Sequence, residues 1–374
     1  MKKTVLGAAT GAMILAACGG GGGSSSSSST GDTNPAPSIS PPSVSLLAAP
    51  GTAAAGPFAA SGDTATDALA FVNNKRAQIG LPALSAQSGV AQAAANHSLW
   101  EQDNNVIGHY ETAGQPGYTG YSPTDRVNLF YSTSSVGEVT AGFSGPFLNS
   151  TEAIEALFDA PFHRAPMLFD SVHAGAGVAN AASTSQLSTL TVDFADYKQV
   201  IGEGQLVAWP YNGMTGVDTG WFANESPNPV AAQPALENTV VGYPVTLSGG
   251  DNAAFSNVSF TIADASGNNV PCLETDSSNN AEATRLAICV PTAKLATSMT
   301  YTAKVSGTLT NTSLAATPFS VSWKFTTAQT DNAPIGAPAA ASPQSSTQSA
   351  SPATATGLAR AAKQTTSGRQ FILN

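Results

Sequence analysis

Two long stretches of the chain contain almost no charged residues, and this limits where a folded core can form. Between Gly19 and Gly62 the only charged residue is Asp32, and after Thr330 there are only four. Both stretches are rich in Gly, Ser, Pro, Ala and Thr, so burial would recover too little free energy to offset the loss of chain entropy. The folded part is therefore expected between about residues 63 and 329.

The expected folded part is strongly acidic. It contains 22 acidic against nine basic residues, a net charge of −13 with the histidines neutral. A field of this sign repels phosphate backbones and anionic lipid heads. We therefore expect no nucleic-acid partner, whereas Ca²⁺, Zn²⁺ and cationic partners remain compatible with the charge.

The N-terminal residues predict export from the cytoplasm. Lys2 and Lys3 precede an apolar run over residues 5–17 that is too short to span a bilayer, so residues 1–17 are expected to be a signal peptide. The run ends in Leu-Ala-Ala followed by Cys18, which resembles the lipobox of bacterial lipoproteins. We expect acyl chains on Cys18 to anchor the protein to a membrane, with residues 18–62 as a disordered tether. The alternative is an ordinary signal peptide followed by a chance cysteine.

This interpretation places the folded part in the cell envelope, outside the cytoplasm. Gly19, directly after Cys18, gives no evident reason for retention at an inner membrane, which favours the outer membrane if the cell has one. The other two cysteines, Cys272 and Cys289, form an even pair in an oxidising compartment, so we expect a disulfide between them. A metal site built from these two cysteines is disfavoured, because no histidine lies at zinc-ligand spacing from either.

Two different periodicities divide the folded part. Helical patterns are expected over residues 64–79, 85–104 and 149–160, and strands over residues 174–179 and 187–195. After about residue 200 no helical pattern follows, and strand candidates separated by Gly, Asn and Asp turns predict an antiparallel β-sandwich. These strand candidates cover residues 240–247, 258–262, 286–290, 301–305 and 321–325.

The expected organisation is therefore an α+β domain over residues 63–201, an all-β sandwich over residues 202–329 and a disordered tail over residues 330–374. Three short pieces of the sandwich resemble bacterial Ig-like modules, which serve as spacers or adhesive elements. They are Trp209-Pro210-Tyr211, residues 225–229 and residues 323–327.

Few polar groups in the chain are candidates for chemistry. The sequence lacks the local motifs of α/β-hydrolases, zinc metalloproteases, P-loop proteins and dinucleotide-binding proteins. It has four histidines, of which His97 is expected to pack on a helix and His173 to lie in a surface loop. The remaining candidates are His109, Glu138 and His163, each in a short segment with Gly or Pro nearby.

The order of these segments resembles the CAP superfamily, which comprises cysteine-rich secretory proteins, antigen 5 and pathogenesis-related proteins and is also called the SCP domain. The resemblance covers roughly residues 64–196. The matching segments are Asn74-Lys75-Arg76 with residues 80–84, Gly108-His109, residues 122–126, Gly137-Glu138, residues 160–168 and residues 175–178.

The resemblance implies an α-β-α sandwich with a central cleft, in which His109, His163 and the acid Glu138 converge. Many eukaryotic members have a second acid three residues before the second histidine, where this chain has Ala160. Asp159 stands next to that place, and Glu152 and Glu155 lie further back on the same helix. Bacterial members often lack this acid.

Two interpretations of the cluster remain. Two neutral imidazoles and a carboxylate suit a divalent metal such as Zn²⁺ with an open position, which would support a metal-dependent hydrolase acting on peptide or cell-wall material with Glu138 as the base. Alternatively, the histidines and Glu138 pair through hydrogen bonds and hold the walls of a binding cleft together. The resemblance favours binding of a lipid, sterol, cell-wall component or protein over catalysis. A purely structural envelope protein is a third possibility.

Overall fold

The computed structural model describes residues 43–337 and 371–373. The signal peptide, Cys18 and most of the expected linker and tail lie outside the described residues. All described residues fall within one compact unit. Among them, no helix combines the length and the apolar character needed to cross a membrane.

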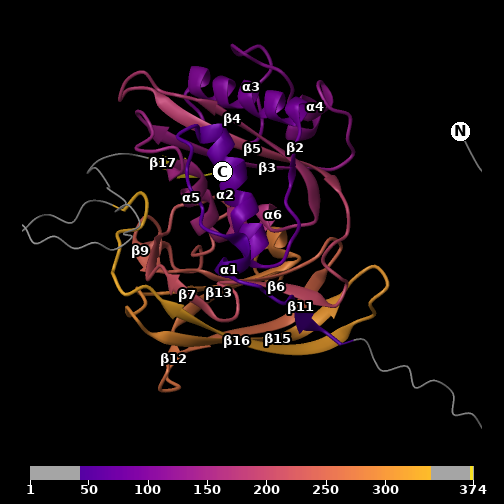
Figure 1. Ribbon diagram of the computed structural model, residues 1–374, viewed down its shortest axis with the longest axis vertical. Coiled ribbons are helices and arrows are strands. Elements are labelled where there is room, and N and C mark those ends of the chain that lie inside the picture. The colour runs from indigo at the N-terminus through magenta and orange to yellow at the C-terminus, as the bar shows by residue number, and fades with distance from the viewer. Residues whose placement is uncertain (1–42, 338–370, 374) are drawn as a thin grey trace, which may run out of the picture. The chain divides into compact units, whose positions relative to one another are not determined.

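A five-stranded sheet forms the centre of the first half, in the order β17-β3-β5-β4-β2. Its strands pair antiparallel except β2, which runs parallel to β4. Figure 1 shows α3 on one side of this sheet and α2, α5 and α6 on the other. The elements of this half are α2 (Thr64–Gln78), β2 (Ser85–Ala86), α3 (Ser88–Asn104), α4 (Pro123–Asn128), β3 (Val136–Ser144), α5 (Glu152–Asp159), α6 (Pro161–Met167), β4 (Ser171–Ala179), β5 (Leu187–Tyr197) and β17 (Phe371–Leu373).

Two further five-stranded sheets form a β-sandwich, in the orders β1-β6-β10-β14-β13 and β12-β11-β15-β16-β7. A short two-stranded sheet, β8-β9, accompanies them. The strands are β1 (Ser45–Leu46), β6 (Gln205–Trp209), β7 (Met214–Val217), β8 (Gly220–Phe222), β9 (Val240–Gly242), β10 (Val245–Gly249), β11 (Ala254–Ala263), β12 (Asn269–Val270), β13 (Cys272–Thr275), β14 (Leu286–Pro291), β15 (Thr300–Thr310) and β16 (Thr317–Thr327). Two 3₁₀ turns, η1 (Pro234–Leu236) and η2 (Ala281–Ala283), complete the set.

The expected fold class is confirmed: a CAP-type α-β-α sandwich is followed by a β-sandwich. The helix expected from residue 64 begins there, because the side chain of Asp63 accepts a hydrogen bond from the backbone N–H of Thr66 and caps the helix. The second helix begins at Ser88 rather than at residue 85, since Ser85 and Ala86 pair with β4 instead. The disulfide between Cys272 and Cys289 is confirmed, and it joins the paired strands β13 and β14.

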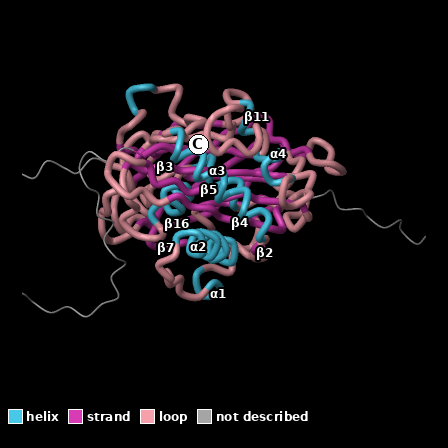
Figure 2. Tube along the Cα trace, turned by 90° about the horizontal axis from the view of Figure 1, so that it is seen from above, coloured by secondary structure: helices cyan, strands magenta, loops and turns pink. Residues whose placement is uncertain are grey.

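The expected linker and tail are wrong where the structure describes them. Ser45 and Leu46 form β1, which runs parallel to β6, and residues 52–55 form α1 (Thr52–Ala55) beside α2. Figure 2 shows α1 next to α2 at the periphery of the strand-rich centre. At the other end, residues 371–373 form β17 on the edge of the central sheet. Strand pairing satisfies main-chain groups in both places, and at the C-terminal one it also buries Phe371, although both sequences are poor in charge.

One hydrophobic core extends through both halves. Phe158 of α5 meets Trp209 of β6 edge to face, with ring centroids 4.8 Å apart. Arg164 of α6 reaches the same region and donates hydrogen bonds to the carbonyl oxygen of Pro244 and to Thr246. The helices that cover the central sheet therefore pack directly on the β-sandwich.

Candidate binding cleft

Glu138, at the start of β3, organises one side of the site. Its side chain is only 1% exposed, and its two oxygens bind different partners. Oε1 lies 2.9 Å from Nδ1 of His109, and Oε2 accepts a hydrogen bond of 2.5 Å from the guanidinium of Arg126. Burial disfavours the charge of Glu138, but the hydrogen bond from His109 and the charges of His97 and Arg126 lower its pKa to about 2.

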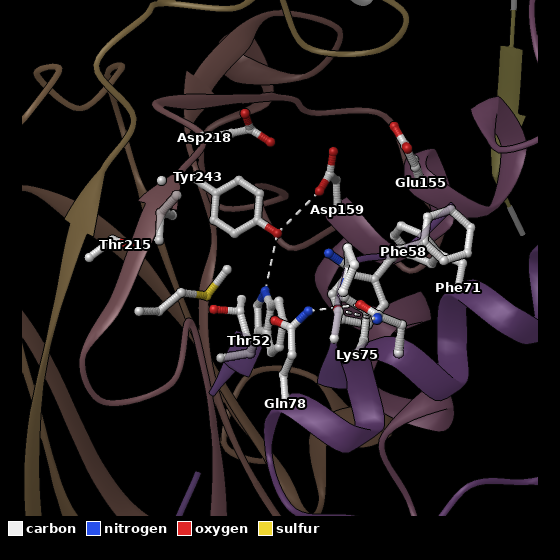
Figure 3. Close-up of a pocket in the computed structure, with 18 of the residues that line it drawn as sticks. Thr52, Phe58, Phe71, Lys75, Gln78, Glu155, Asp159, Thr215, Asp218 and Tyr243 are labelled. Atoms are coloured by element: carbon white, nitrogen blue, oxygen red, sulfur yellow. Dashed lines mark hydrogen bonds between the residues drawn. The ribbon is translucent and has the colours of Figure 1, made fainter. Parts of the chain in front are cut away.

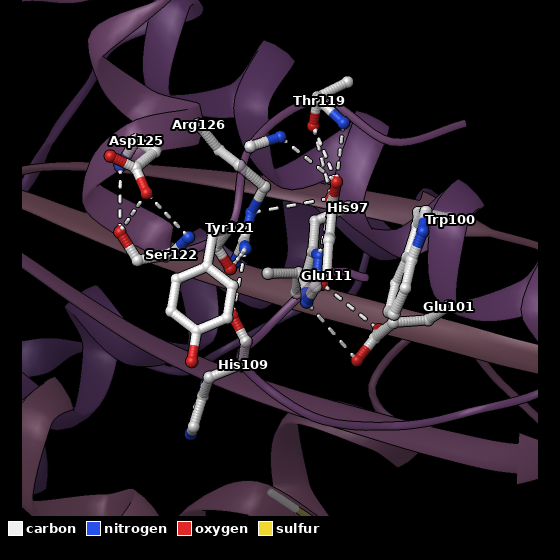
Figure 4. Close-up of polar contacts among 12 residues, drawn as sticks. His97, Trp100, Glu101, His109, Glu111, Thr119, Tyr121, Ser122, Asp125 and Arg126 are labelled. Atoms are coloured by element: carbon white, nitrogen blue, oxygen red, sulfur yellow. Dashed lines mark hydrogen bonds and ion pairs between the residues drawn. The ribbon is translucent and has the colours of Figure 1, made fainter. Parts of the chain in front are cut away.

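A buried polar network supports the segment that carries His109. His97 of α3 contacts Glu111 through Nδ1 at 3.0 Å and the carbonyl oxygen of Gly108 through Nε2 at 2.9 Å. Glu111 also accepts hydrogen bonds from the backbone N–H groups of Thr119 and Gly120. Figure 4 shows these contacts around His97 and Glu111, with the ring of His109 directed away from them. The network fixes the loop between α3 and α4, so His109 is presented from a rigid base.

The buried charged side chains in and beside this network shift one another's pKa values. Burial alone would lower the pKa of His97, but its hydrogen bond to Glu111 and the nearby carboxylates of Glu138 and Glu101 raise it. Burial raises the pKa of Glu101 to about 7. Asp193 lies directly opposite Glu138 in the pairing of β3 with β5. Burial and the adjacent charge of Glu138 raise the pKa of Asp193 well above its usual value.

His163, in α6, has a separate carboxylate partner. Its Nδ1 lies 2.8 Å from Oε2 of Glu225, which also accepts a hydrogen bond from the backbone N–H of Phe162. Glu225 belongs to the segment between β8 and β9, outside the α-β-α sandwich, and its side chain is completely buried. Burial raises the pKa of Glu225, although the hydrogen bond to His163 opposes this shift.

His109, Glu138 and His163 line one pocket of about 290 Å³. Its apolar wall comes mainly from α6 and the residues around it, and a second wall comes from the β-sandwich half. The apolar lining comprises Val139, Phe162, Ala165, Pro166 and Phe169, and the second wall comprises Ser226, Pro227, Glu282, Arg285 and Leu286. The guanidinium carbon of Arg285 lies 3.5 Å from the ring centroid of Phe169, and Nη1 donates to Asp251.

The two imidazoles are held in the same way. Each ring has its Nδ1 at hydrogen-bond distance from a carboxylate, which assigns the proton to Nδ1 and leaves Nε2 as the available atom. The ring of His109 is 31% exposed, whereas that of His163 is 4% exposed. His109 is therefore the more accessible of the two imidazoles.

A metal ion fits this set only in part. Carboxylate support at Nδ1 is the usual outer-shell arrangement of histidine ligands, but zinc needs at least three protein ligands. Glu138 already binds His109 and Arg126. Among residues 43–337 and 371–373, no group of three or more His, Cys, Asp or Glu side chains is arranged to hold a metal.

None of the three acids considered from the sequence as the second acid of the cleft lies in it. Asp159 accepts a hydrogen bond of 3.1 Å from the hydroxyl of Tyr243 and, like Glu155, lines a different pocket. Glu152 accepts one from the backbone N–H of Leu148. Glu225, which does meet His163, lies 62 residues later in a segment that resembles an Ig-like module, so no local pattern links it to the cleft.

The other histidines occupy places that differ from the cleft. His97 is fully buried, within the expectation of a packed helix residue. His173, expected in a surface loop, lies instead in β4, where its Nδ1 is 2.9 Å from Asp196. Tyr110 and Tyr121, in the loop between α3 and α4, stack on each other with ring centroids 4.9 Å apart, and both are largely exposed.

Comparisons with known proteins agree with the family resemblance. The model of the Cysteine-rich secretory protein family, CAP, matches residues 69–194. No curated protein matches the chain.

Among solved structures, an outer surface protein from Borrelia burgdorferi is similar at 16% identity. The match covers 35% of this chain and 90% of that protein, with a TM-score of 0.29. An extracellular protein containing an SCP domain from Bacillus anthracis str. Ames is similar at 20% identity, over 37% of this chain and 44% of that one, with a TM-score of 0.29.

Proposed function

Residues 69–194 are a CAP domain, and on this premise we propose that the chain is a binding protein of the cell envelope that holds a small amphipathic ligand in the His109–His163 pocket. One observation carries this proposal. Two imidazoles, each fixed through Nδ1 by a buried carboxylate, line the same pocket as an apolar wall.

The lining indicates how such a ligand would lie. Nε2 of His109 and of His163 and the guanidinium of Arg285 can hydrogen-bond a hydroxyl or a carboxylate. Phe162, Pro166 and Phe169 offer an apolar surface for the rest of the ligand. A volume of about 290 Å³ is at the lower end of the range for small-molecule sites, which favours a single chain or a small lipid fragment over a bulky sterol.

The same proposal includes attachment to a membrane through Cys18, outside the cytoplasm. The disulfide between Cys272 and Cys289 supports an oxidising compartment. Substituting Cys18→Ala is expected to abolish incorporation of a labelled fatty acid and to release the protein from membranes. Recovery of an unlabelled wild-type protein from the soluble fraction would contradict the anchor without affecting the binding proposal.

Calorimetric titration with decanoate and with decanol tests the binding proposal. We expect one-to-one binding of at least one of them, lost in a His109→Ala, His163→Ala double variant. His173→Ala is the matched control, because His173 lies outside the pocket and pairs with Asp196. An Arg285→Gln variant identifies the head group: it should weaken decanoate binding and leave decanol binding unchanged. Binding that survives in the double variant would contradict the proposal.

A metal-dependent hydrolase is the second candidate, favoured by the carboxylate support of both imidazoles. Titration with Zn²⁺ distinguishes it. One-to-one binding of Zn²⁺ that is lost in the double variant, without binding of either amphiphile, would replace the first proposal with this one. If the fold is intact and neither Zn²⁺ nor either amphiphile binds saturably, a structural role in the envelope is the remaining interpretation.

A further inference from the structure

A second pocket, of about 610 Å³, shares no lining residue with the His109–His163 pocket. It lies between the helices α1, α2 and α5 on one side and the strands β6 and β7 on the other. Figure 3 shows side chains from both sides directed into it. Part of the lining lies outside residues 69–194, the region that the family model matches: Thr52, Trp209 and Tyr243 are not included in it.

Aromatic rings form the inner wall of this pocket. Phe71 meets Phe58 and Phe158 edge to face, with centroid separations of 5.7 and 5.6 Å, and Phe158 meets Trp209 at 4.8 Å. Four of the five rings in the wall, including that of Tyr243, are almost fully buried. Their positions are therefore fixed by packing before any ligand arrives.

The pocket already places one cation against these rings. Nζ of Lys75 lies 4.7 Å from the centroid of Phe71, 5.7 Å from that of Phe158 and 5.8 Å from that of Trp209. These distances are within the range of cation–π attraction. The wall is thus suited to hold positive charge beside apolar surface.

Carboxylates outnumber this single cation. Figure 3 shows Asp218, Asp159 and Glu155 in the upper part of the pocket, with Tyr243 beneath Asp218. The hydroxyl of Tyr243 donates to Asp159 and accepts from the indole N–H of Trp209. The lining therefore contains three carboxyl groups against one lysine, a formal charge of −2.

A buried amide adds an acceptor without a partner. Gln78 is 5% exposed, and its Nε2 donates to Oδ1 of Asn74 at 2.9 Å, which fixes the orientation of the amide. Its Oε1 is buried and accepts no hydrogen bond from any described residue. Figure 3 shows this amide at the floor of the pocket, next to Thr52. A buried carbonyl oxygen of this kind favours a ligand that donates hydrogen bonds.

From the aromatic wall, the excess of carboxylates and the unpartnered oxygen of Gln78, we propose that this pocket binds an organic cation. The ligand class is a primary ammonium or amidinium group on a flat or linear apolar body, as in a basic side chain of a peptide. Its apolar part packs on the rings, and its charged N–H groups bind the carboxylates and Gln78. The proposal is independent of the function proposed for the His109–His163 pocket.

Calorimetric titration of the full chain with benzamidine tests this proposal. Benzamide is the neutral control of the same shape, benzoate is the anionic control, and methyl glucoside is a neutral donor-rich control. We expect saturable one-to-one binding of benzamidine that weakens with added salt, and at least about tenfold weaker binding of the three controls.

Variants locate the binding. Asp218→Asn is expected to weaken benzamidine binding about tenfold, and Gln78→Leu several-fold, with circular dichroism unchanged. Glu237→Gln removes an exposed carboxylate outside the pocket and should leave binding unchanged. The His109→Ala, His163→Ala double variant should also bind normally.

Four results would overturn the proposal. Equal binding of benzamide and benzamidine would make the pocket merely apolar, and preferential binding of methyl glucoside would assign it to neutral sugars. Absence of saturation up to about 10 mM benzamidine, or full binding by a folded Asp218→Asn variant, would show that the carboxylates do not form a cation site.

Discussion

At the scale of single residues, the site depends on carboxylates whose protonation differs although all are buried. His109 and Arg126 bind Glu138 directly and lower its pKa, whereas burial and the charge of Glu138 raise the pKa of Asp193, which lies opposite it in the sheet. Glu101 lies between these extremes, with a pKa of about 7. The protonation pattern therefore follows the hydrogen-bond partners of each group more than its depth.

Glu101 predicts a specific pH dependence of stability. Its pKa is about 4.5 when unfolded and about 7 when folded, so the folded protein binds more protons in this interval and stability falls as pH rises from 4.5 to 7. The raised pKa of His97 acts in the same direction above pH 6.5. In urea denaturation, the free energy of unfolding of wild type should fall by about 2 kcal/mol more between pH 5 and 7.5 than that of the Glu101→Gln variant. Equal slopes in the two proteins would contradict the assignment to Glu101.

Replacing Glu225 is predicted to destabilise the protein even when no ligand is present. Glu225→Ala removes the buried partner of His163 and an acceptor for the backbone N–H of Phe162, so we expect a loss of about 3 kcal/mol in the free energy of unfolding. Glu237→Ala, at an exposed position in the same connecting segment, should change it by less than about 0.5 kcal/mol. Equal effects of the two variants would show that Glu225 does not support the cleft.

The sequence identifies only one side of this site. His109, Glu138 and His163 stand in short segments with a characteristic order, so they could be found by resemblance. Glu225 and Arg285 contact the cleft from a half of the chain that has no motif of its own, and pairing over 62 residues leaves no periodic pattern. Arg126, in the matching segment 122–126, donates to the carbonyl oxygen of His109 and also pairs with Glu138.

At the scale of elements, α3 packs closely on β4. A Cβ atom added at Gly175 would collide with the backbone of Ala91, and one at Gly177 with the backbone of Ala95. The Gly-x-Gly segment noted in the sequence is therefore needed for the approach of a helix to the sheet. Hydrophobic periodicity predicted that both elements exist, but it does not report the distance between them, and it missed that Ser85 and Ala86 pair with β4.

Gly177→Ala tests this close approach. Because neither the helix backbone nor the strand can move aside without breaking hydrogen bonds, we expect a loss of about 3 kcal/mol in unfolding free energy, measured by urea denaturation. Gly137→Ala in β3 is the matched control, since its Cβ would meet only the ring of Phe194 at ordinary contact distance, 3.8 Å. Similar stability of the two variants would mean that α3 does not lie this close to β4.

At the scale of the whole molecule, residues outside the CAP domain complete two of its features. β17 covers an edge of the central sheet, next to β3, where Phe371 stacks on Phe143 at 5.2 Å. The β-sandwich closes one side of the His109–His163 pocket and supplies Glu225. Composition indicated correctly that most charge lies between the two ends, but low charge does not prevent a short strand from pairing with an available edge.

Reduction of the disulfide is predicted to weaken the sandwich. The bond between Cys272 and Cys289 closes a short loop between adjacent strands, with a sequence separation of 17, so its loss should lower the unfolding free energy by about 3 kcal/mol. Urea denaturation with and without reductant measures this effect, and a Cys272→Ala, Cys289→Ala variant should not respond to reductant. An unchanged midpoint for the wild type would show that the bond adds no stability.

The central claim is that His109 and His163 face one binding cleft, and NMR of the four histidine rings tests it most directly. During titration with decanoate or decanol, the imidazole signals of His109 and His163 should shift together and saturate at one equivalent, while those of His173 stay unchanged. Shifts of only one of the two rings, or equal shifts of His173, would contradict a shared cleft.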